Sequence, residues 1–299
     1  MKSPVAVIIF NRPDCARELY ESLKVYKPEQ LFIVSDGPRG THPGEAEKVV
    51  ETRAVFSKID WECKVYRNES DINLGCRERV ISGLDWLFSL VDCAIILEDD
   101  CIPHQDFFRF ASELLTRYEH DTRIMSICGT NIFYSECPTD FSYSFSKYFF
   151  CWGWATWKRS WDLFDRQWIG LDYVKNIGFS RDYLGSYRAA WYWNFILERS
   201  RSGIEDDWGS NFLFSIFLNH GLNIVPRHNL VKNIGIGIES THTKRIPIYM
   251  PKKVESLDFP LVHPPYVFAH AKLDRLTEDT IFSKSLYKRL LWALHKLHF

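Results

Sequence analysis

Residues 94–100 read A-I-I-L-E-D-D, and the rest of the predicted fold is arranged around them. The first four residues form a short apolar run, which is typical of a buried strand in a parallel sheet. The run ends in three consecutive carboxylates, Glu98, Asp99 and Asp100. In open α/β sheets, ligands bind beyond the carboxyl ends of the strands. The stretch therefore predicts a buried strand that carries a ligand site at its end.

The three adjacent acids repel one another unless a cation, an arginine or solvent compensates their charge. Hard oxygen donors suit Mg²⁺ or Mn²⁺, and such an ion in turn suits a pyrophosphate. The alternative is a solvated acidic turn at the start of the next helix, which is the commoner case for an acidic triplet taken alone. The neighbouring segments provide the evidence that distinguishes a metal site from a solvated turn.

Short apolar runs alternate with amphipathic stretches through the first half of the chain. Strands are predicted at residues 5–10, 31–35, 64–67 and 94–100, with another at 124–128. Helices are predicted at residues 13–23, 45–57, 77–88 and 105–118. Pro13 and Asp14 suit the first turn of the first helix. This alternation predicts an α/β fold with a mostly parallel, Rossmann-like sheet and helices on both faces.

The composition is that of a compact protein with a large core. The chain has 299 residues, of which 46% are hydrophobic and 25% are charged. A net charge of -1 gives no reason to expect nucleic acid as a partner. Residues 1–128 form the predicted α/β half and 129–250 a second half of the same compact unit, whose dense aromatic residues indicate a substrate-facing part. Residues 251–299 form a C-terminal extension with the basic segment described next.

Two features bear on location. The apolar run at residues 5–10 is too short for a signal peptide or a membrane span, and the eight cysteines show no C-x-x-C pair, so a cytosolic protein with reduced thiols is expected. Residues 284–299 combine leucines at helical spacing with lysines and an arginine. This pattern predicts a basic amphipathic helix that lies on anionic membranes, or equally a packed terminal helix with a solvated basic face.

A second carboxylate cluster, Glu205-Asp206-Asp207, lies about a hundred residues after the first. If the first cluster holds a metal, an acid of the second is free to act as a general base. Acids at this position also suit a helix N-terminus, where they favour the helix dipole. The two interpretations are compatible.

Residues 233–244 read N-I-G-I-G-I-E-S-T-H-T-K, a glycine-punctuated loop with hydroxyls and one imidazole. Such a loop can close over a diphosphate, with His242 as a metal or phosphate contact. The spacing matches no stand-alone phosphate-binding motif, and a single loop histidine is usually just exposed.

Together these segments resemble nucleotide-sugar glycosyltransferases of the GT-A fold. The resemblance is greatest to family 2 enzymes and to Golgi N-acetylglucosaminyltransferase I. It is carried by P-V-A-V-I-I-F-N-R at 4–12, V-S-D-G at 34–37, N-L-G at 73–75, L-E-D-D-C-I-P-H-Q-D-F-F at 97–108 and E-D-D-W at 205–208. It covers roughly residues 4–244, and the E-D-D segment is its most specific part.

The resemblance implies a role for each matching residue. Contacts to the donor nucleotide-sugar would come from Arg12, Asp36, Arg77, Glu98, Asp99, Trp154 and Trp208. Asp100 would ligate Mn²⁺ or Mg²⁺, with His242 as a second candidate ligand. Asp206 or Asp207 would deprotonate the acceptor hydroxyl.

The resulting expectation is a metal-dependent, inverting glycosyltransferase that moves a sugar from a UDP-sugar to a glycan or lipid-linked acceptor. Synthesis of bacterial surface polysaccharide on the cytosolic face of the membrane is the expected setting. A sugar nucleotidyltransferase is the nearest alternative, but such enzymes need a glycine-rich loop after the first strand, where this chain has F-N-R-P-D at 10–14. A non-catalytic carbohydrate-binding protein on the same fold is the other.

Overall fold

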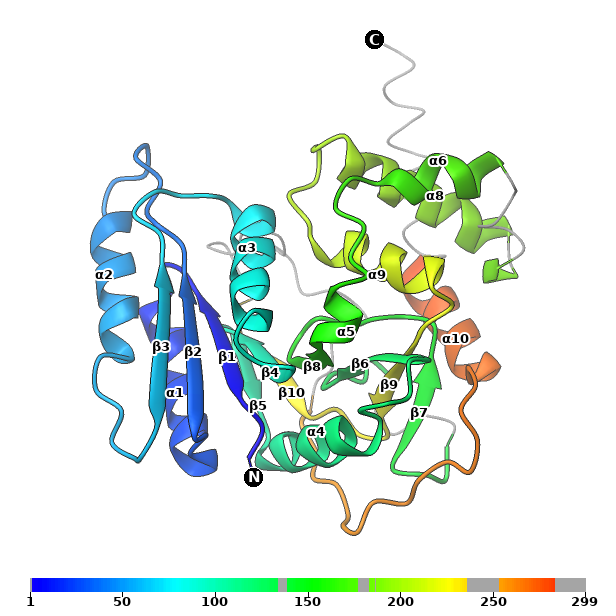
Figure 1. The fold of residues 1–299 in the computed structure, drawn as a ribbon, viewed down its shortest axis with the longest axis horizontal. Helices are drawn as coiled ribbons and strands as arrows, with labels where there is room; N and C mark the ends of the chain where they lie inside the picture. The colour runs from blue at the N-terminus through cyan, green and yellow to red at the C-terminus, as the bar shows by residue number, and fades with distance from the viewer. Residues whose placement is uncertain (1, 134–138, 177–182, 186, 236–252, 283–299) are drawn as a thin grey trace.

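The structure is a computed structural model, and it describes residues 2–133, 139–176, 183–185, 187–235 and 253–282. Its central feature is an eight-stranded sheet with the strand order β3-β2-β1-β4-β8-β6-β9-β7 (Figure 1). The first four of these strands are parallel to one another: β1 (Val5–Ile9), β2 (Gln30–Ser35), β3 (Lys64–Glu69) and β4 (Cys93–Glu98). This half is the Rossmann-like sheet that the sequence predicts, and the predicted fold class is confirmed.

The other four strands extend the same sheet with mixed directions. β8 (Trp154–Trp157) is inserted between β4 and β6 (Ile124–Cys128) and runs antiparallel to both. β9 (Leu222–Pro226) is parallel to β6, and β7 (Tyr143–Ser146) closes the edge antiparallel to β9. One continuous sheet therefore joins the two halves of the chain.

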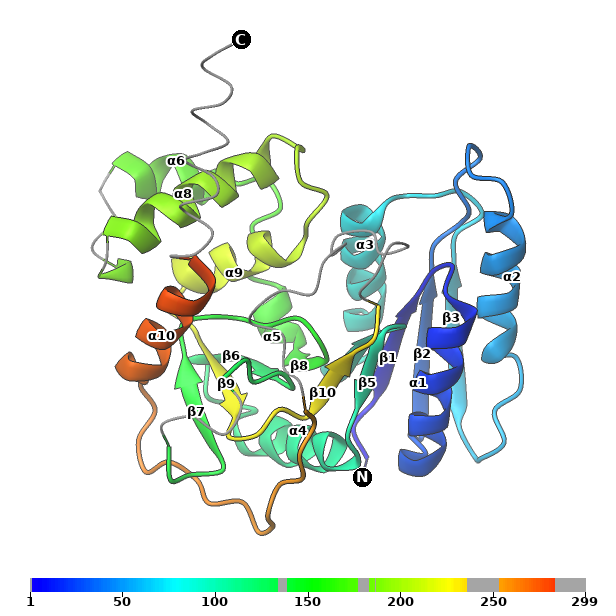
Figure 2. The same ribbon diagram turned by 180° about the vertical axis from the view of Figure 1, so that it is seen from behind.

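Alternate residues of the central strands face two separate cores. On β1, Val5 and Val7 pack in a cluster with residues of α1 (Pro13–Tyr26) and α4 (Gln105–Arg117). Ala6, between them, packs in a second cluster with α3 (Cys76–Phe88) and α9 (Gly209–Leu218). Figure 1 shows α3 in front of the sheet, and Figure 2 shows α1 on the opposite face. Both faces of the parallel half are thus covered, as continuous apolar strands require.

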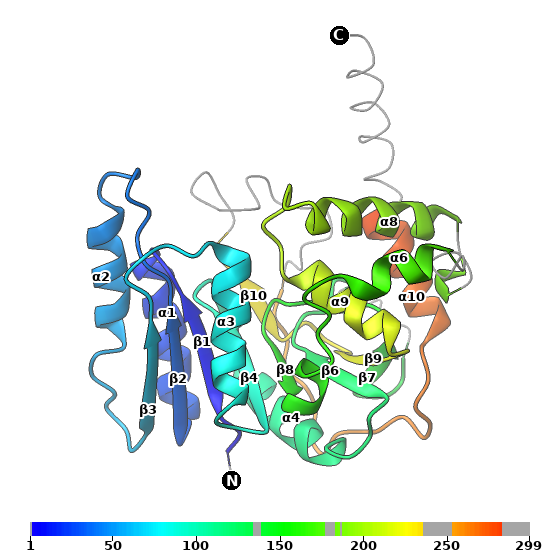
Figure 3. The same ribbon diagram turned by 45° about the horizontal axis from the view of Figure 1, so that its top comes forward.

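The remaining helices are peripheral. α2 (Glu45–Val55) packs beside α1, and the short α5 (Lys158–Trp161) follows β8. α8 (Tyr187–Arg201) packs on α9, and α6 (Ile169–Asn176) lies near it at the end of the molecule (Figure 3). α10 (Ala271–Thr277) and the π-helical turn η2 (Glu278–Phe282) end the described chain.

A two-stranded ribbon lies beside the sheet, next to the E-D-D triplet. β5 (Cys101–Pro103) follows directly after the E-D-D triplet and pairs antiparallel with β10 (Val231–Asn233). This pairing brings the start of the glycine-punctuated loop next to the acids. His242 and the predicted C-terminal helix at 284–299 lie outside the described residues. Within the described ranges, no helix has both the length and the apolar character that crossing a membrane requires.

Candidate active site

The strand order places the candidate site at a reversal in the sheet. From β1 the chain adds β2 and then β3 on one side, and β4 then pairs with the other side of β1. Ile8 of β1 lies opposite Glu98 of β4, so the residues that follow these two strands are neighbours. Such a reversal is where open α/β sheets bind their ligands. The E-D-D triplet is therefore at the position where a ligand site is expected.

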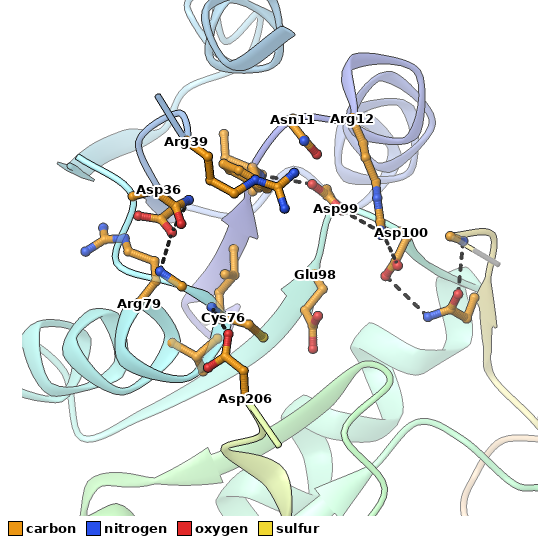
Figure 4. Close-up of a pocket in the computed structure, with 18 of the residues that line it drawn as sticks. Asn11, Arg12, Asp36, Arg39, Cys76, Arg79, Glu98, Asp99, Asp100 and Asp206 are labelled. Carbon is orange, nitrogen blue, oxygen red and sulfur yellow. Dashed lines mark hydrogen bonds and ion pairs between the residues drawn. The ribbon is translucent and has the colours of Figure 1, made fainter. Parts of the chain in front are cut away.

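A pocket of about 280 Å³ lies at this reversal, and eight of the nineteen residues that line it are charged (Figure 4). The ionisable residues among them are Arg12, Asp36, Arg39, Cys76, Arg79, Glu98, Asp99, Asp100 and Asp206. The structure thus brings together residues that are up to about two hundred positions apart in the chain.

Arg12, just before α1, is the cation nearest to the triplet. Its Nη1 lies 2.5 Å from Oδ2 of Asp100 and 3.7 Å from Oδ1 of Asp99. Burial would lower the pKa of this guanidinium, but the charges of Asp99 and Asp100 together raise it above its ordinary value. Asp99 also accepts a hydrogen bond from the backbone N–H of Phe10 at 3.0 Å. These contacts tie the loop after β1 to the end of β4.

The chain after β10 covers the other side of Asp100. Asn233 donates its Nδ2 to Oδ1 of Asp100 at 3.3 Å, and the N–H of Ile234 donates to the Asp100 carbonyl at 2.8 Å. A Cβ built on Gly235 would lie 1.9 Å from Oδ2 of Asp100 and 2.6 Å from Nη1 of Arg12. Only glycine leaves room for the ion pair at this position.

Glu98 differs from its neighbours, because no hydrogen bond or ion pair of its carboxylate occurs in the described part of the chain. Burial raises the pKa of both Glu98 and Asp99, and the charge of Asp100 raises both further. Figure 4 shows the Glu98 side chain between the Asp99–Asp100 pair and Asp206. The pocket therefore holds an acid that gains or loses a proton nearer to neutral pH than a carboxylate in water.

The balance of charge bears on the expected metal. Five carboxylates and three arginines line the pocket, so acids are in excess there. Neighbouring carboxylates repel one another unless a positive charge compensates them. No group of three or more His, Cys, Asp or Glu side chains among the described residues can hold a metal by itself. Mg²⁺ is often bound through one or two carboxylates with substrate phosphates as the other ligands. Asp99 and Asp100 offer a donor set of that kind, and Arg12 pairs with it in this structure.

Asp36, at the end of β2, holds the N-L-G turn. Its carboxylate accepts hydrogen bonds from the backbone N–H groups of Leu74 and Gly75, at 2.9 and 3.1 Å, and from Nδ2 of Asn73 at 3.0 Å. The turn leads directly into α3, so Asp36 positions the start of that helix. Asp36 also lines the pocket, at the wall opposite the acidic triplet.

Asp206 and Asp207 are separated by the structure. Asp206 lines the pocket and accepts the backbone N–H groups of Cys76 and Arg77, at 2.9 and 3.0 Å, at the start of α3. Asp207 accepts the N–H groups of Gly209 and Ser210 at the start of α9, and it is not among the residues that line the pocket. Both acids are therefore helix caps, but only Asp206 is also at the site.

Three of the predicted donor contacts lie elsewhere. Nη1 of Arg77 donates to the carbonyl of Ser200 at 3.2 Å, so this side chain turns away from the pocket. Trp154 and Trp208 are 0% and 3% exposed, and their rings stack on each other with centroids 5.4 Å apart. Both rings are part of the core, and neither is among the residues that line the pocket.

Sequence reasoning missed two arginines of the pocket, Arg39 and Arg79. Arg79 follows Arg77 by two residues in α3, and residues two apart point to opposite sides of a helix. Arg77 and Arg79 therefore cannot share one face, and the phase of the helix, which starts at Cys76, selects Arg79. Arg39 pairs with Glu45 at the start of α2. Its place in the turn after β2 is the only feature of the sequence that could have marked it as a site residue.

Comparisons with known proteins add little to this geometry. No family model matches the chain, and no curated protein matches it either. A solved structure described as 4-diphosphocytidyl-2C-methyl-D-erythritolsynthase from Anaerococcus prevotii is similar to it with a TM-score of 0.33 and 8% identity, covering 54% of this chain and 74% of that one. A UDP-glucose pyrophosphorylase complexed with UDP-glucose gives a TM-score of 0.31 and 9% identity, covering 54% and 78%. Likeness at this level carries no argument about family or activity.

Proposed function

We propose that the protein is a transferase that binds a nucleoside diphosphate sugar in this pocket and passes the sugar to an acceptor hydroxyl with inversion. The observation that carries the proposal is the meeting of Arg12, after β1, with the triplet after β4 at the reversal of the sheet. The resemblance of the E-D-D and N-L-G segments to GT-A glycosyltransferases supports the same reading.

The proposed role of each residue follows from its position in the pocket. Asp36 and the turn that it holds form one wall, beside the buried Arg79, and suit the nucleoside. Arg12 lies at the acidic wall, where the diphosphate would be close to Asp99 and Asp100. A divalent cation, held by Asp100 with the phosphates, would offset the charge that builds on the departing diphosphate.

Asp206 is the proposed general base. It is the acid of the second cluster that lines the pocket, and the two N–H groups of α3 fix its orientation. A carboxylate held in place can take the proton of an acceptor hydroxyl as the new bond forms. Glu98 is the other acid placed to do so, because its carboxylate has no partner among the described residues.

Nucleotidyl transfer to a sugar phosphate is the second candidate. The names of the two solved structures favour this reaction over glycosyl transfer, although their TM-scores are too low to carry the argument. The sequence after β1 argues against nucleotidyl transfer, because this segment has no glycine and α1 begins at Pro13, only a few residues after the strand. Such a loop offers few backbone N–H groups to a triphosphate.

The products distinguish the two reactions. The protein is incubated with UDP-sugars and a panel of glycosides, and separately with UTP and sugar 1-phosphates, each with Mn²⁺ and with excess chelator. Glycosyl transfer releases UDP and gives a product whose anomeric configuration, read by NMR, is inverted. Release of pyrophosphate from UTP would establish the second candidate instead. Loss of turnover in chelator, restored by Mn²⁺, is the expected result for the metal.

The structure provides a matched pair of variants for the base. Asp206→Asn and Asp207→Asn each alter a helix cap, but only Asp206 lines the pocket. Asp206→Asn should lower turnover by about 10²-fold or more and leave UDP binding within a few fold, whereas Asp207→Asn should change turnover little. Equal effects of the two variants would show a role in stability alone, and Glu98→Gln would then be the next test.

A further inference from the structure

Trp152 separates the donor pocket from a second cavity. The second cavity has a volume of about 210 Å³, and Trp152 lines both. Six of the twelve residues that line it are aromatic: Tyr148, Phe149, Phe150, Trp152, Tyr192 and Trp193. It lies in the second half of the chain, between the segment before β8, α8, α9, α10 and η2.

Three hydroxyl groups in this wall already have hydrogen-bond partners. Thr130 donates its hydroxyl to the carbonyl of Trp152 at 2.7 Å, and Thr277 donates to the carbonyl of Leu273 at 3.0 Å. Tyr148 donates its hydroxyl to Oε1 of Glu278 at 2.7 Å. A sugar ring needs several hydrogen-bond partners when it is buried, because its hydroxyls lose water. Because these hydroxyls are engaged and most of the other residues of the wall are aromatic or aliphatic, the wall suits an apolar group better than a sugar.

The cavity is also close to the acids of the donor pocket. Cys151 lines the cavity, and its thiol has a pKa well above the ordinary value, first through burial and then through the negative charge of Glu98. A group in the cavity and a nucleotide-sugar in the pocket would therefore be neighbours on the two sides of Trp152. The raised pKa also keeps the thiol neutral, so it adds no charge to the wall.

We propose that this cavity binds an apolar group of the acceptor, of the size of one aromatic ring or a short alkyl chain, while the hydroxyl to be modified reaches past Trp152 to the donor. An apolar protein cavity of about 150 Å³ is large enough to bind benzene, so the volume here is sufficient. The acceptor part of this inference rests on the proposed function. The binding of an apolar group does not.

The first experiment measures the cavity by itself. Benzyl alcohol and the polar myo-inositol are titrated against the whole protein and followed by ligand-observed NMR. Ile281→Trp places a large side chain at the wall of the cavity, and Ile169→Trp makes the same change at a position that is 73% exposed. Benzyl alcohol should bind to the native protein and to Ile169→Trp, and at least tenfold more weakly to Ile281→Trp. Absence of binding, equal binding to Ile281→Trp, or binding of inositol as strong as that of benzyl alcohol would overturn the proposal.

The second experiment links the cavity to transfer. Benzyl and methyl glycosides of the same sugars are compared as acceptors, with circular dichroism to check that each variant is folded. The benzyl glycoside should have a KM at least fivefold lower in the native protein, and Ile281→Trp should remove the difference without changing UDP binding. Binding of benzyl alcohol without transfer to any glycoside would refute the proposed function and leave the cavity assignment standing. Transfer with equal KM values for both glycosides would refute the acceptor assignment alone.

Discussion

Gly235 is the residue on which the arrangement of Arg12 and Asp100 depends most directly. A methyl group there would lie within 1.9 Å of Oδ2 of Asp100, and neither side chain can move freely because the two are paired at 2.5 Å. Gly235→Ala should therefore separate the pair and weaken UDP binding by about tenfold or more, or about 1.4 kcal/mol. Isothermal titration calorimetry measures this, with Gly40→Ala as the control, since a Cβ at Gly40 meets nothing within 4 Å. Unchanged affinity in Gly235→Ala would show that the ion pair is not part of the nucleotide site.

At this scale the sequence predicted best those residues that follow directly from a strand end. Asp99, Asp100, Asp36 and Arg12 each come within a few residues after a strand, and all of them line the pocket. Arg79 could not be selected over Arg77, because the sequence alone does not fix which side of α3 faces the pocket. The capping role of Asp206 depends on α3, which lies about a hundred and thirty residues earlier in the chain.

Asp274 lies in α10 and bonds to Ser146 of β7, and its burial predicts that the free energy of unfolding depends on pH. The residue is 3% exposed, accepts hydrogen bonds from Ser146 and the N–H of Lys147 on one oxygen, and its other oxygen is buried without a partner in the described chain. Burial raises its pKa to about 6, against about 3.9 in the unfolded chain. The folded state thus keeps the proton to higher pH, so the free energy of unfolding falls as the pH rises from about 4 to about 6.

Asp274→Asn removes this titration and keeps an acceptor for Ser146. The variant should lose the slope between about pH 4 and pH 6, and at pH 7.5 it should be more stable than the native protein by about 2 kcal/mol. Urea unfolding at a series of pH values measures this. Asp60→Asn, at an exposed position, is the control for the loss of one carboxylate. Parallel curves for the native protein and Asp274→Asn would contradict the assignment.

The elements of the parallel half could be predicted because each is encoded locally, by an apolar run or by helical spacing. The insertion of β8 between β4 and β6 could not. Its residues, W-A-T-W at 154–157, are all buried, so they show no alternation, and the partners of the strand are distant in sequence. The last four residues of the aromatic block at 148–157, which suggested a substrate-facing part, form the core strand β8, and Trp154 with Trp208 fills that core.

For the whole molecule, the single sheet predicts that the two halves unfold together and that a nucleotide stabilises both. The antiparallel pairing of β4 with β8 joins them, and residues of both halves line the pocket, for example Arg12 from the first and Asp206 from the second. UDP at a hundred times its dissociation constant should then add about 2.7 kcal/mol to the free energy of unfolding.

Two spectroscopic signals distinguish the halves. Most of the 11 tryptophans follow residue 150, so their fluorescence reports the second half, whereas far-UV circular dichroism reports both. The two signals should follow one urea transition, with and without UDP, and at the same UDP concentration Gly235→Ala should reduce the added stability to about 1.4 kcal/mol or less. Two separate transitions, of which UDP moves only one, would show that the nucleotide contacts a single half and that the sheet does not couple the two.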